Sequence, residues 1–152
     1  IAPAGMMQLP RASRLLTLPG IGWWILRVFG DRIIVRRMPH TLTGNPDHLR
    51  VFMEEYARQL RFKGYKRALR ATMRDYDLAR MDPVYERAGK QAGRSGMLIW
   101  GTADTVVNYA LHERVLGLVP WLNFQAVDGG GHTVNYELSD AVNRHIIDML
   151  TE

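Results

Sequence analysis

The sequence contains no cysteine among its 152 residues. This absence excludes a disulfide scaffold, a zinc site held by thiolates and a cysteine nucleophile. Serine is scarce too, since Ser13, Ser95 and Ser139 are the only three in the chain. The lack of cysteine leaves the cellular compartment open, because many proteins of reducing and oxidising compartments do without it.

The chain also lacks a long uninterrupted hydrophobic run. Its most apolar stretch, residues 20–29, contains Arg27. A helix needs about 20 apolar residues to cross a bilayer, and this stretch is about half that length. The sequence therefore predicts no transmembrane helix.

Acidic side chains are scarce in the first half of the chain. Residues 11–74 carry 14 Lys and Arg against 4 Asp and Glu, whereas residues 75–152 carry 6 against 11. A basic segment is compatible with nucleic acid, an anionic membrane surface or an acidic substrate. The arginines are spread along predicted helices and form no nucleic-acid recognition motif, so a solvated cationic face is the simplest interpretation.

What is present matches an ordinary globular chain. Hydrophobic residues make up 47% and charged residues 23%, a composition that excludes disorder as the main state. The length is that of about one domain. No internal repeat or low-complexity tract interrupts it.

The first part of the chain is predicted to be helical. Residues 6–44 contain three prolines and several glycines, which predicts short helices at about 11–18 and 22–29 with loops between them. From Asn45 and Pro46 onward, apolar residues at spacings of three and four predict an amphipathic helix. Two further helices are predicted before residue 93.

After residue 93 the pattern changes to strands alternating with helices. The apolar run 97–100 predicts a buried strand and residues 121–127 predict a second one. Helices are expected at about 108–117 and 137–150. This alternation predicts an α/β fold with a parallel sheet and covering helices.

Two titratable residues follow the two predicted strands. Asp104 comes after the first strand, and His132 comes after the second strand behind three glycines, 129–131. Catalytic groups of open parallel sheets gather at the carboxyl ends of the strands, and a glycine run permits a tight turn with positive φ. Because a carboxylate that orients a histidine is two thirds of an acyl-transfer triad, we predict Asp104 as the acid and His132 as the general base.

Other interpretations of these residues stay open. His132 is alternatively an ordinary loop histidine, and Asp128, four residues before it, is a rival for the acid. The other four histidines show no repeated ligand spacing, so we expect no metal site. They are His40, His48, His112 and His145.

The same residues resemble the C-terminal half of a capped member of the α/β-hydrolase family. In that family the acid follows a Trp-Gly-x-x-Asp pattern, here Trp100 to Asp104, and the histidine lies in a Gly-His turn, here Gly131 and His132. Glu137 also matches, although the family's proline region is absent. The resemblance implies a partial α/β-hydrolase fold: parallel sheet strands with covering helices plus an inserted helical cap.

The resemblance divides the chain into three segments and implies that the nucleophile lies outside it. Residues 1–7 would be the end of a core strand and a loop, 8–92 the helical cap, and 93–152 the C-terminal part of the core. The family needs a Gly-x-Ser-x-Gly elbow between a strand and a helix, which this sequence lacks. Ser95 lies in Gly-Arg-Ser-Gly-Met and precedes a strand, so we expect the nucleophile and oxyanion donors upstream of Ile1.

The resemblance further implies a hydrolase that needs no cofactor and acts on a small hydrophobic ester or lipid-like substrate. Trp23, Trp24 and Phe29 in the cap and Val106 beside the acid are the candidate substrate contacts, unless the cap residues form a helical core instead. Its other implied partner is the missing N-terminal half of the same protein. An Asp nucleophile would instead give haloalkane dehalogenase or epoxide hydrolase chemistry.

A non-catalytic interpretation also remains open. The tryptophans stand beside Arg27, Arg32, Arg36 and Arg37, a combination that suits peripheral contact with an anionic membrane surface through the cap. For nucleic acid the sequence offers only its charge and no recognition motif, so we expect no nucleic-acid partner.

Overall fold

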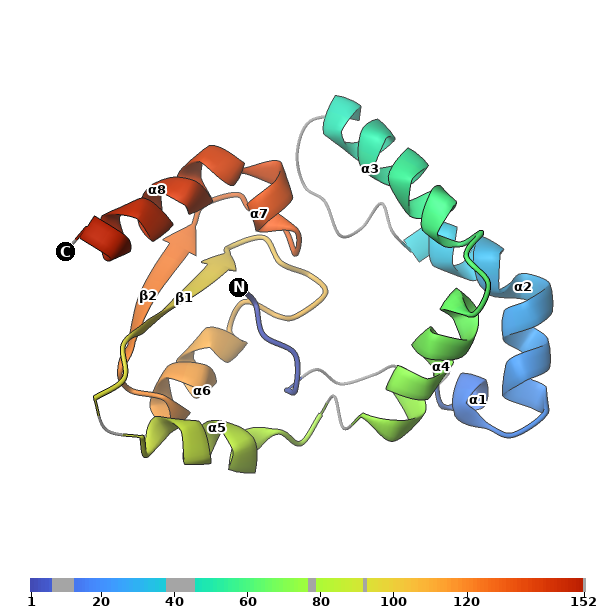
Figure 1. The fold of residues 1–152 in the computed structure, drawn as a ribbon, viewed down its shortest axis with the longest axis horizontal. Helices are drawn as coiled ribbons and strands as arrows, with labels where there is room; N and C mark the ends of the chain where they lie inside the picture. The colour runs from blue at the N-terminus through green and yellow to red at the C-terminus, as the bar shows by residue number, and fades with distance from the viewer. Residues whose placement is uncertain (7–12, 38–45, 77–78, 92, 152) are drawn as a thin grey trace.

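The computed structural model describes residues 1–6, 13–37, 46–76, 79–91 and 93–151. Figure 1 shows a helical lobe beside an α/β lobe. The helical lobe consists of α1 (Ser13–Thr17), α2 (Ile21–Arg37), α3 (Pro46–Gln59) and α4 (Tyr65–Asp75). The α/β lobe consists of α5 (Asp82–Gly89), β1 (Gly96–Gly101), α6 (Leu111–Leu118), β2 (Leu122–Val127), α7 (Val134–Glu137) and α8 (Ser139–Thr151).

The two strands form a parallel pair, as the sequence predicts. Gly96 lies opposite Leu122 and Gly101 lies opposite Val127, with α6 in the crossover between them. On the other edge of β1, the amide of Ala2 donates a hydrogen bond to the Ile99 carbonyl at 3.0 Å. Residues 1–6 form coil that leaves β1 toward the start of α5, where the Met81 amide donates to the Gly5 carbonyl at 2.9 Å. Residue 7, the end of the predicted first segment, lies outside the described residues.

Helices cover both faces of this small sheet. Leu98 and Trp100 point to one face, where they pack with Val107 and Val115 of the α6 side. Ile99 points to the other face and packs with Val127, Val134 and Val142 of the α7 and α8 side. The alternation follows from the two-residue period of a strand, and it explains why the run 97–100 is apolar throughout. The fold is therefore α/β, with a two-stranded parallel sheet.

The prediction of a short helix at 22–29 is wrong, because α2 continues to Arg37. Gly30 does not end it. A Cβ on Gly30 would lie 3.1 Å from the Lys66 side chain of α4, a tight contact that this flexible side chain can relieve by a small shift. Gly30 is thus accommodated inside α2, which packs against α4.

The last predicted helix, at about 137–150, is α8 in the structure, and a short helix that was not predicted, α7, precedes it. Leu138 has φ −126° and ψ 48°, outside the helical region, and separates α7 from α8. The periodicity also predicts Ile146 and Leu150 to face inward, yet they are 39% and 79% exposed. Only Val142 of α8 is buried, since α8 reaches the strands mainly through its first half.

The helical lobe has its own packing. Leu26 and Ile34 are the buried apolar residues of α2, which packs against α1 and α4. Arg70 of α4 donates hydrogen bonds to the carbonyls of Leu16, Thr17 and Leu18 at 3.1 to 3.2 Å. The carbonyls of Leu16 and Thr17 end α1, and that of Leu18 also accepts the Gly22 amide at 3.1 Å. One guanidinium therefore both caps α1 and fastens it to α4.

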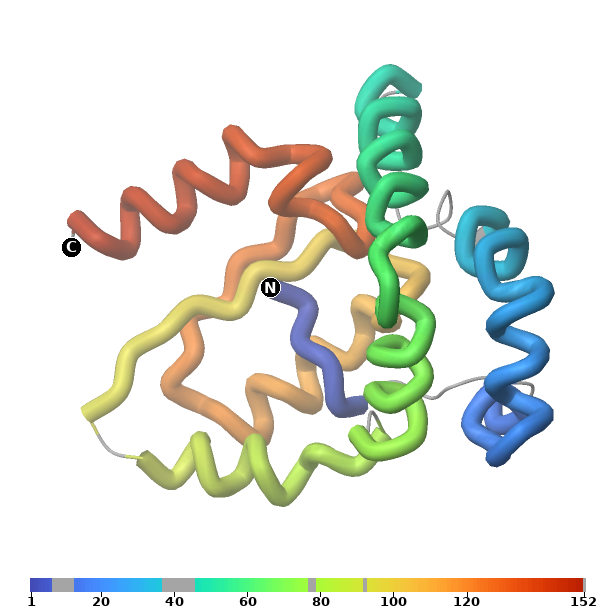
Figure 2. The backbone as a smooth tube through the Cα atoms, turned by 45° about the vertical axis from the view of Figure 1, so that its right-hand side comes forward, coloured from blue at the N-terminus to red at the C-terminus, as the bar shows by residue number. Residues whose placement is uncertain are grey.

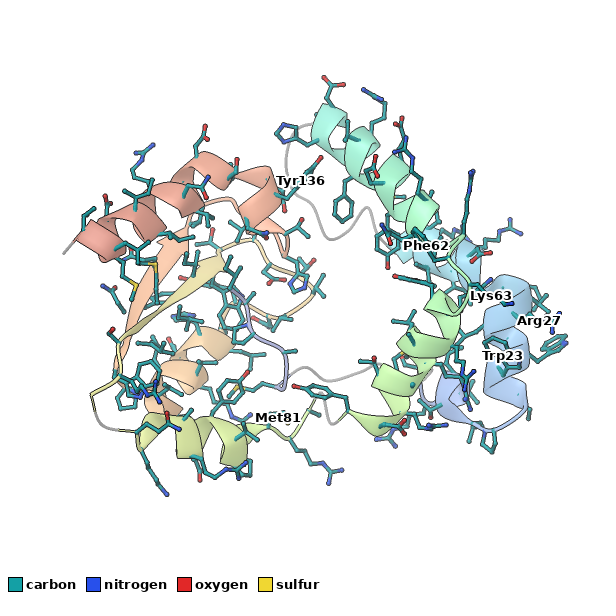
Figure 3. All side chains as sticks on the ribbon, in the orientation of Figure 1. Trp23, Arg27, Phe62, Lys63, Met81 and Tyr136 are labelled. Atoms are coloured by element: carbon teal, nitrogen blue, oxygen red, sulfur yellow. The ribbon has the colours of Figure 1, made fainter. Side chains whose placement is uncertain are left out.

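The two lobes meet where α3 faces α7. The Tyr136 hydroxyl donates to the His48 carbonyl at 3.3 Å, and the Tyr136 ring lies 5.6 Å from that of Phe52. Figure 3 shows Tyr136 between the two elements. In Figures 1 and 2, α3 and α4 lie between the α/β lobe and α2. None of the described helices has the length and hydrophobicity that a membrane crossing requires.

Candidate active site

Asp104 and His132 meet at the carboxyl ends of the two strands. Asp104 Oδ2 lies 3.0 Å from His132 Nδ1, although the residues are 28 positions apart in sequence. The Asp104 side chain is fully buried, whereas the His132 side chain is 30% exposed. The carboxylate therefore fixes the buried side of the imidazole and leaves the other side of the ring accessible.

The backbone of the acid loop holds Asp104 in this orientation. Its Oδ1 accepts hydrogen bonds from the amides of Val106 and Val107, both at 2.9 Å. The indole of Trp100, at the end of β1, donates to the Val107 carbonyl at 3.2 Å. Oδ1 is thus used to close the loop, and Oδ2 is left to face the histidine. These hydrogen bonds explain why a tryptophan at the end of β1 is followed, four residues later, by an aspartate.

Glycines bring the histidine loop against the acid loop. A Cβ on Gly101 would lie 2.2 Å from the Gly130 carbonyl oxygen, so only glycine permits this approach. The amide of Ala103 donates to the same carbonyl at 2.9 Å. Within the predicted glycine turn, Gly129 adopts φ +69°, which β-carbon-bearing residues rarely do. The loop therefore delivers His132 to the carboxylate by close backbone contact.

The surroundings of Asp104 keep it ionised. Burial is the largest influence and by itself raises the pKa of Asp104, but it is outweighed by the hydrogen bond to His132, the amides of Val107 and Val106, and the attraction to His132. The net effect lowers the pKa of Asp104 below its ordinary value of 3.8. A carboxylate next to the imidazole can stabilise the ring when it takes up a proton.

The structure separates Asp128 from this pair. Its Oδ1 accepts a hydrogen bond from the Thr102 hydroxyl at 3.1 Å, and that hydroxyl in turn accepts one from the Gly129 amide at 2.9 Å. Asp128 is exposed and its contacts fasten the loop after β2 to the loop after β1. These contacts give Asp128 a structural role in joining the two loops, and they involve neither Asp104 nor His132.

The serines lie away from the histidine loop or on exposed positions. Ser95 directly precedes the amino end of β1, whereas His132 follows the carboxyl end of the neighbouring strand. A strand rises about 3.3 Å per residue, so the six residues of β1 put about 20 Å between the two ends. Ser139 is an exposed residue at the start of α8, and Ser13 begins α1 in the helical lobe.

The predicted substrate contacts lie in two places. Val106 is next to the acid, and its half-buried side chain packs against the core around Trp100. Trp23, Trp24 and Phe29 are on α2 and are 40%, 58% and 46% exposed. Because α3 and α4 lie between α2 and the α/β lobe (Figure 2), the structure does not bring these three residues to His132.

A row of aromatic residues that the sequence analysis did not single out lies closer to the histidine loop. It consists of Phe52 and Tyr56 of α3, Tyr65 of α4 and Tyr136 of α7, joined ring to ring at 5.6 to 6.2 Å. The Tyr56 and Tyr65 hydroxyls are 2.6 Å apart, and burial followed by this hydrogen bond raises the pKa of Tyr56. The sequence does contain a signal for this row, the helical spacing of Phe52 and Tyr56. The same spacing is equally typical of residues that pack in the core of a helical bundle.

The described residues offer no metal site. No group of three or more His, Asp or Glu side chains in that part of the chain could hold an ion. His112 stacks on Phe124 with ring centroids 4.5 Å apart, and its Nδ1 lies 2.7 Å from the Tyr109 carbonyl. His40 lies outside the described residues.

Comparison with known proteins gives a fold and no family assignment. No family model matches the chain. No curated protein matches it either. Among solved structures it is similar to a thermophilic esterase, with a TM-score of 0.69 at 13% sequence identity. The likeness is one of fold. It covers 97% of this chain and 53% of the esterase, so the chain spans about half the length of that enzyme.

Proposed function

We propose that this chain is the cap and the C-terminal part of the catalytic core of an α/β-fold hydrolase with esterase-like activity. Residues 8–92 would be the cap and 93–152 the core, with 1–7 ending a core strand. Within the cap range, α5 packs against α6 of the α/β lobe and not against the other cap helices that the structure describes. The observation that carries the proposal is the 3.0 Å contact between Asp104 Oδ2 and His132 Nδ1 at the carboxyl edge of a parallel sheet. The esterase-like fold supports it.

In the proposed reaction His132 is the general base and then the general acid. With Nδ1 donating to Asp104, Nε2 carries a lone pair and accepts the proton of a nucleophilic hydroxyl as that oxygen attacks the ester carbonyl. The imidazolium then gives this proton to the leaving alkoxide, and an acyl-enzyme remains. Water, deprotonated by the same Nε2, attacks the acyl group and releases the carboxylic acid and the free nucleophile.

The buried Asp104 has two tasks in this scheme. It holds the tautomer with hydrogen on Nδ1, and its negative charge stabilises the imidazolium formed in each half-reaction. Both tasks require the ionised carboxylate, which the lowered pKa of Asp104 supplies.

The nucleophile and the oxyanion donors would come from sequence that precedes Ile1. The chain has no Gly-x-Ser-x-Gly elbow, and it corresponds to about half of the esterase whose fold it shares. The edge of β1 next to Ala2 is where further strands would join the sheet, since Ala2 already bonds to Ile99 there.

The substrate class is proposed to be a hydrophobic carboxylic ester. The aromatic row from Tyr136 to Tyr65 extends from the histidine loop along the cap. Phe52, Tyr56 and Tyr65 are partly buried, and Tyr136 is 37% exposed. Such a wall favours an apolar acyl or alcohol group over a charged one. Val106, beside the acid, is the proposed contact from the core side.

The test uses the protein extended upstream of Ile1. Its hydrolysis of nitrophenyl esters should be abolished by His132→Ala and unaffected by His145→Ala, an exchange on α8 outside the proposed site. A fluorophosphonate probe should label one serine upstream of Ile1, and only when His132 is present. Labelling of an aspartate-linked alkyl intermediate instead would favour dehalogenase or epoxide hydrolase chemistry, and full ester turnover by His132→Ala would refute the proposal.

A further inference from the structure

The outward side of α2 is unusually apolar for an exposed helix face. Leu26 and Ile34 are buried toward the rest of the helical lobe. On the opposite side, side chains at spacings of three and four remain exposed: Ile21 by 60%, Trp24 by 58% and Val28 by 53%. Apolar residues therefore lie exposed on the outward side of α2 as well as on its packed side, although only the packed side contacts protein among the described residues.

Further exposed apolar side chains lie on α2 and just before it in the chain. Phe29, 46% exposed, makes an edge-to-face contact with Trp24 at 5.9 Å between ring centroids. Leu15 and Leu18, just before α2, are 53% and 44% exposed. We call these six residues the α2 face: Leu15, Leu18, Ile21, Trp24, Val28 and Phe29. Figure 3 shows the neighbouring Trp23 and Arg27 at the edge of the molecule remote from the sheet.

The α2 face is surrounded by positive charge. Arg27, Arg32 and Arg36 are exposed on α2, and no ion pair joins them to a carboxylate of the described residues. The one acidic residue of α2, Asp31, is paired with Lys66 of α4 at 3.0 Å. The apolar side chains are thus accompanied by cations whose charge is not neutralised within this part of the protein.

We propose that the α2 face docks on the surface of an anionic lipid bilayer. Aliphatic side chains and tryptophan suit the boundary between headgroups and acyl chains, where an interfacial helix buries its apolar side. Arginines beside them suit lipid phosphates, because a negatively charged leaflet attracts basic side chains close to its surface. The helix lies along the surface, since it is too charged and too short in apolar residues to enter further.

Other occupants fit the α2 face less well. A second copy of the chain packed about a twofold axis would bring the same arginines together across the interface. A nucleic acid would satisfy the arginines but not the exposed leucine, isoleucine and valine side chains. The combination of apolar and cationic groups on one helix favours the lipid surface.

Docking by the α2 face uses neither Asp104 nor His132. It holds whether or not the chain is part of a hydrolase, and the two proposals fail independently. If both hold, the membrane contact lies on the opposite side of α3 and α4 from the histidine loop (Figures 1 and 2).

The test is cosedimentation of the full chain with vesicles of phosphatidylcholine alone and of phosphatidylcholine with one third phosphatidylserine. We expect binding to the anionic vesicles at low ionic strength, weakened by salt, and little binding to the neutral ones. The triple variant Arg27→Gln, Arg32→Gln, Arg36→Gln should lower the partition coefficient about tenfold or more. Trp24→Ala should lower it about tenfold, since it removes apolar area that the bilayer covers.

Matched controls separate the α2 face from net charge and from folding. Arg87→Gln, Arg94→Gln and Arg144→Gln make the same change in charge at exposed positions of the α/β lobe, and Leu150→Ala shortens a side chain that is 79% exposed on α8. Both controls should bind as the parent does. Absence of binding to anionic vesicles at low salt, an equal loss in the control triple variant, or self-association that Trp24→Ala removes would each overturn the proposal.

Discussion

At the scale of single residues, the site depends on which atom of Asp104 faces which partner. Asp104→Asn keeps an oxygen for the amides of Val106 and Val107 but presents an NH2 group to His132 Nδ1. The ring must then accept at Nδ1 and carry its proton on Nε2, where it cannot act as a base. In the protein extended upstream of Ile1, we expect kcat for ester hydrolysis to fall about a thousandfold or more.

The matched exchange for that experiment is Asp128→Asn. Asp128 bonds to Thr102 and lies outside the pair, so its variant should keep kcat within about threefold of the parent, because only a loop contact changes. A large loss in Asp128→Asn together with an active Asp104→Asn would exchange the two roles and contradict the assignment.

The lowered pKa of Asp104 also predicts how the stability of the protein changes at acid pH. This pKa is lower in the folded protein than its ordinary value of 3.8, so the ionised carboxylate favours folding at pH above 3.8, and this contribution disappears as the pH falls through the folded value. The free energy of unfolding should therefore differ most between parent and Asp104→Asn near neutral pH, and the difference should shrink below pH 3.8. Urea titrations over this range measure it, and a difference independent of pH would be inconsistent with the pairing.

At the scale of elements, the end of β1 and the loop after β2 are fitted to each other. Gly101→Ala would place a methyl group 2.2 Å from the Gly130 carbonyl oxygen, which forces the two loops apart. We expect a loss of about 2 kcal/mol or more in the free energy of unfolding, with a loosened contact between Asp104 and His132. Thermal unfolding and the NMR signal of the His132 ring proton report the two effects.

Gly117→Ala is the control for the glycine exchange. Gly117 lies in α6, and a Cβ there would meet nothing within 4 Å. Alanine favours a helix by up to about 1 kcal/mol over glycine, so this variant should be as stable as the parent or more so. If Gly101→Ala were equally well tolerated, the close fit of the loops would not be needed for folding.

The sequence predicts elements well where one strong pattern acts. The run 97–100 identifies β1 because four consecutive apolar residues require burial on both faces, and Asp104 and His132 follow because parallel strands end at one edge. The sequence predicts poorly where contacts between distant elements determine the local structure. Gly30 suggests a helix break, yet α2 continues through it to Arg37 and packs against α4. The sequence spacing could pair Phe52 with Tyr56 but not with Tyr136, because Tyr136 comes from the other lobe.

At the scale of the whole molecule, the two lobes carry different features. The α/β lobe orients the acid and the histidine, and the helical lobe carries the aromatic row on its inner side and the α2 face on its outer side. The charge division along the chain follows this arrangement, because residues 11–74 with their excess of Lys and Arg include the described helices of the helical lobe. The sequence could indicate a cationic half but not which side of its helices faces the solvent.

The central claim is that Asp104 and His132 serve a nucleophile that this chain does not contain. Pre-steady-state release of nitrophenolate from an activated acyl ester tests it most directly. The protein extended upstream of Ile1 should give a burst equal to one acyl group per site, absent in His132→Ala and retained in Ser95→Ala. A burst from residues 1–152 alone that depends on His132, or one that Ser95→Ala abolishes, would contradict the account.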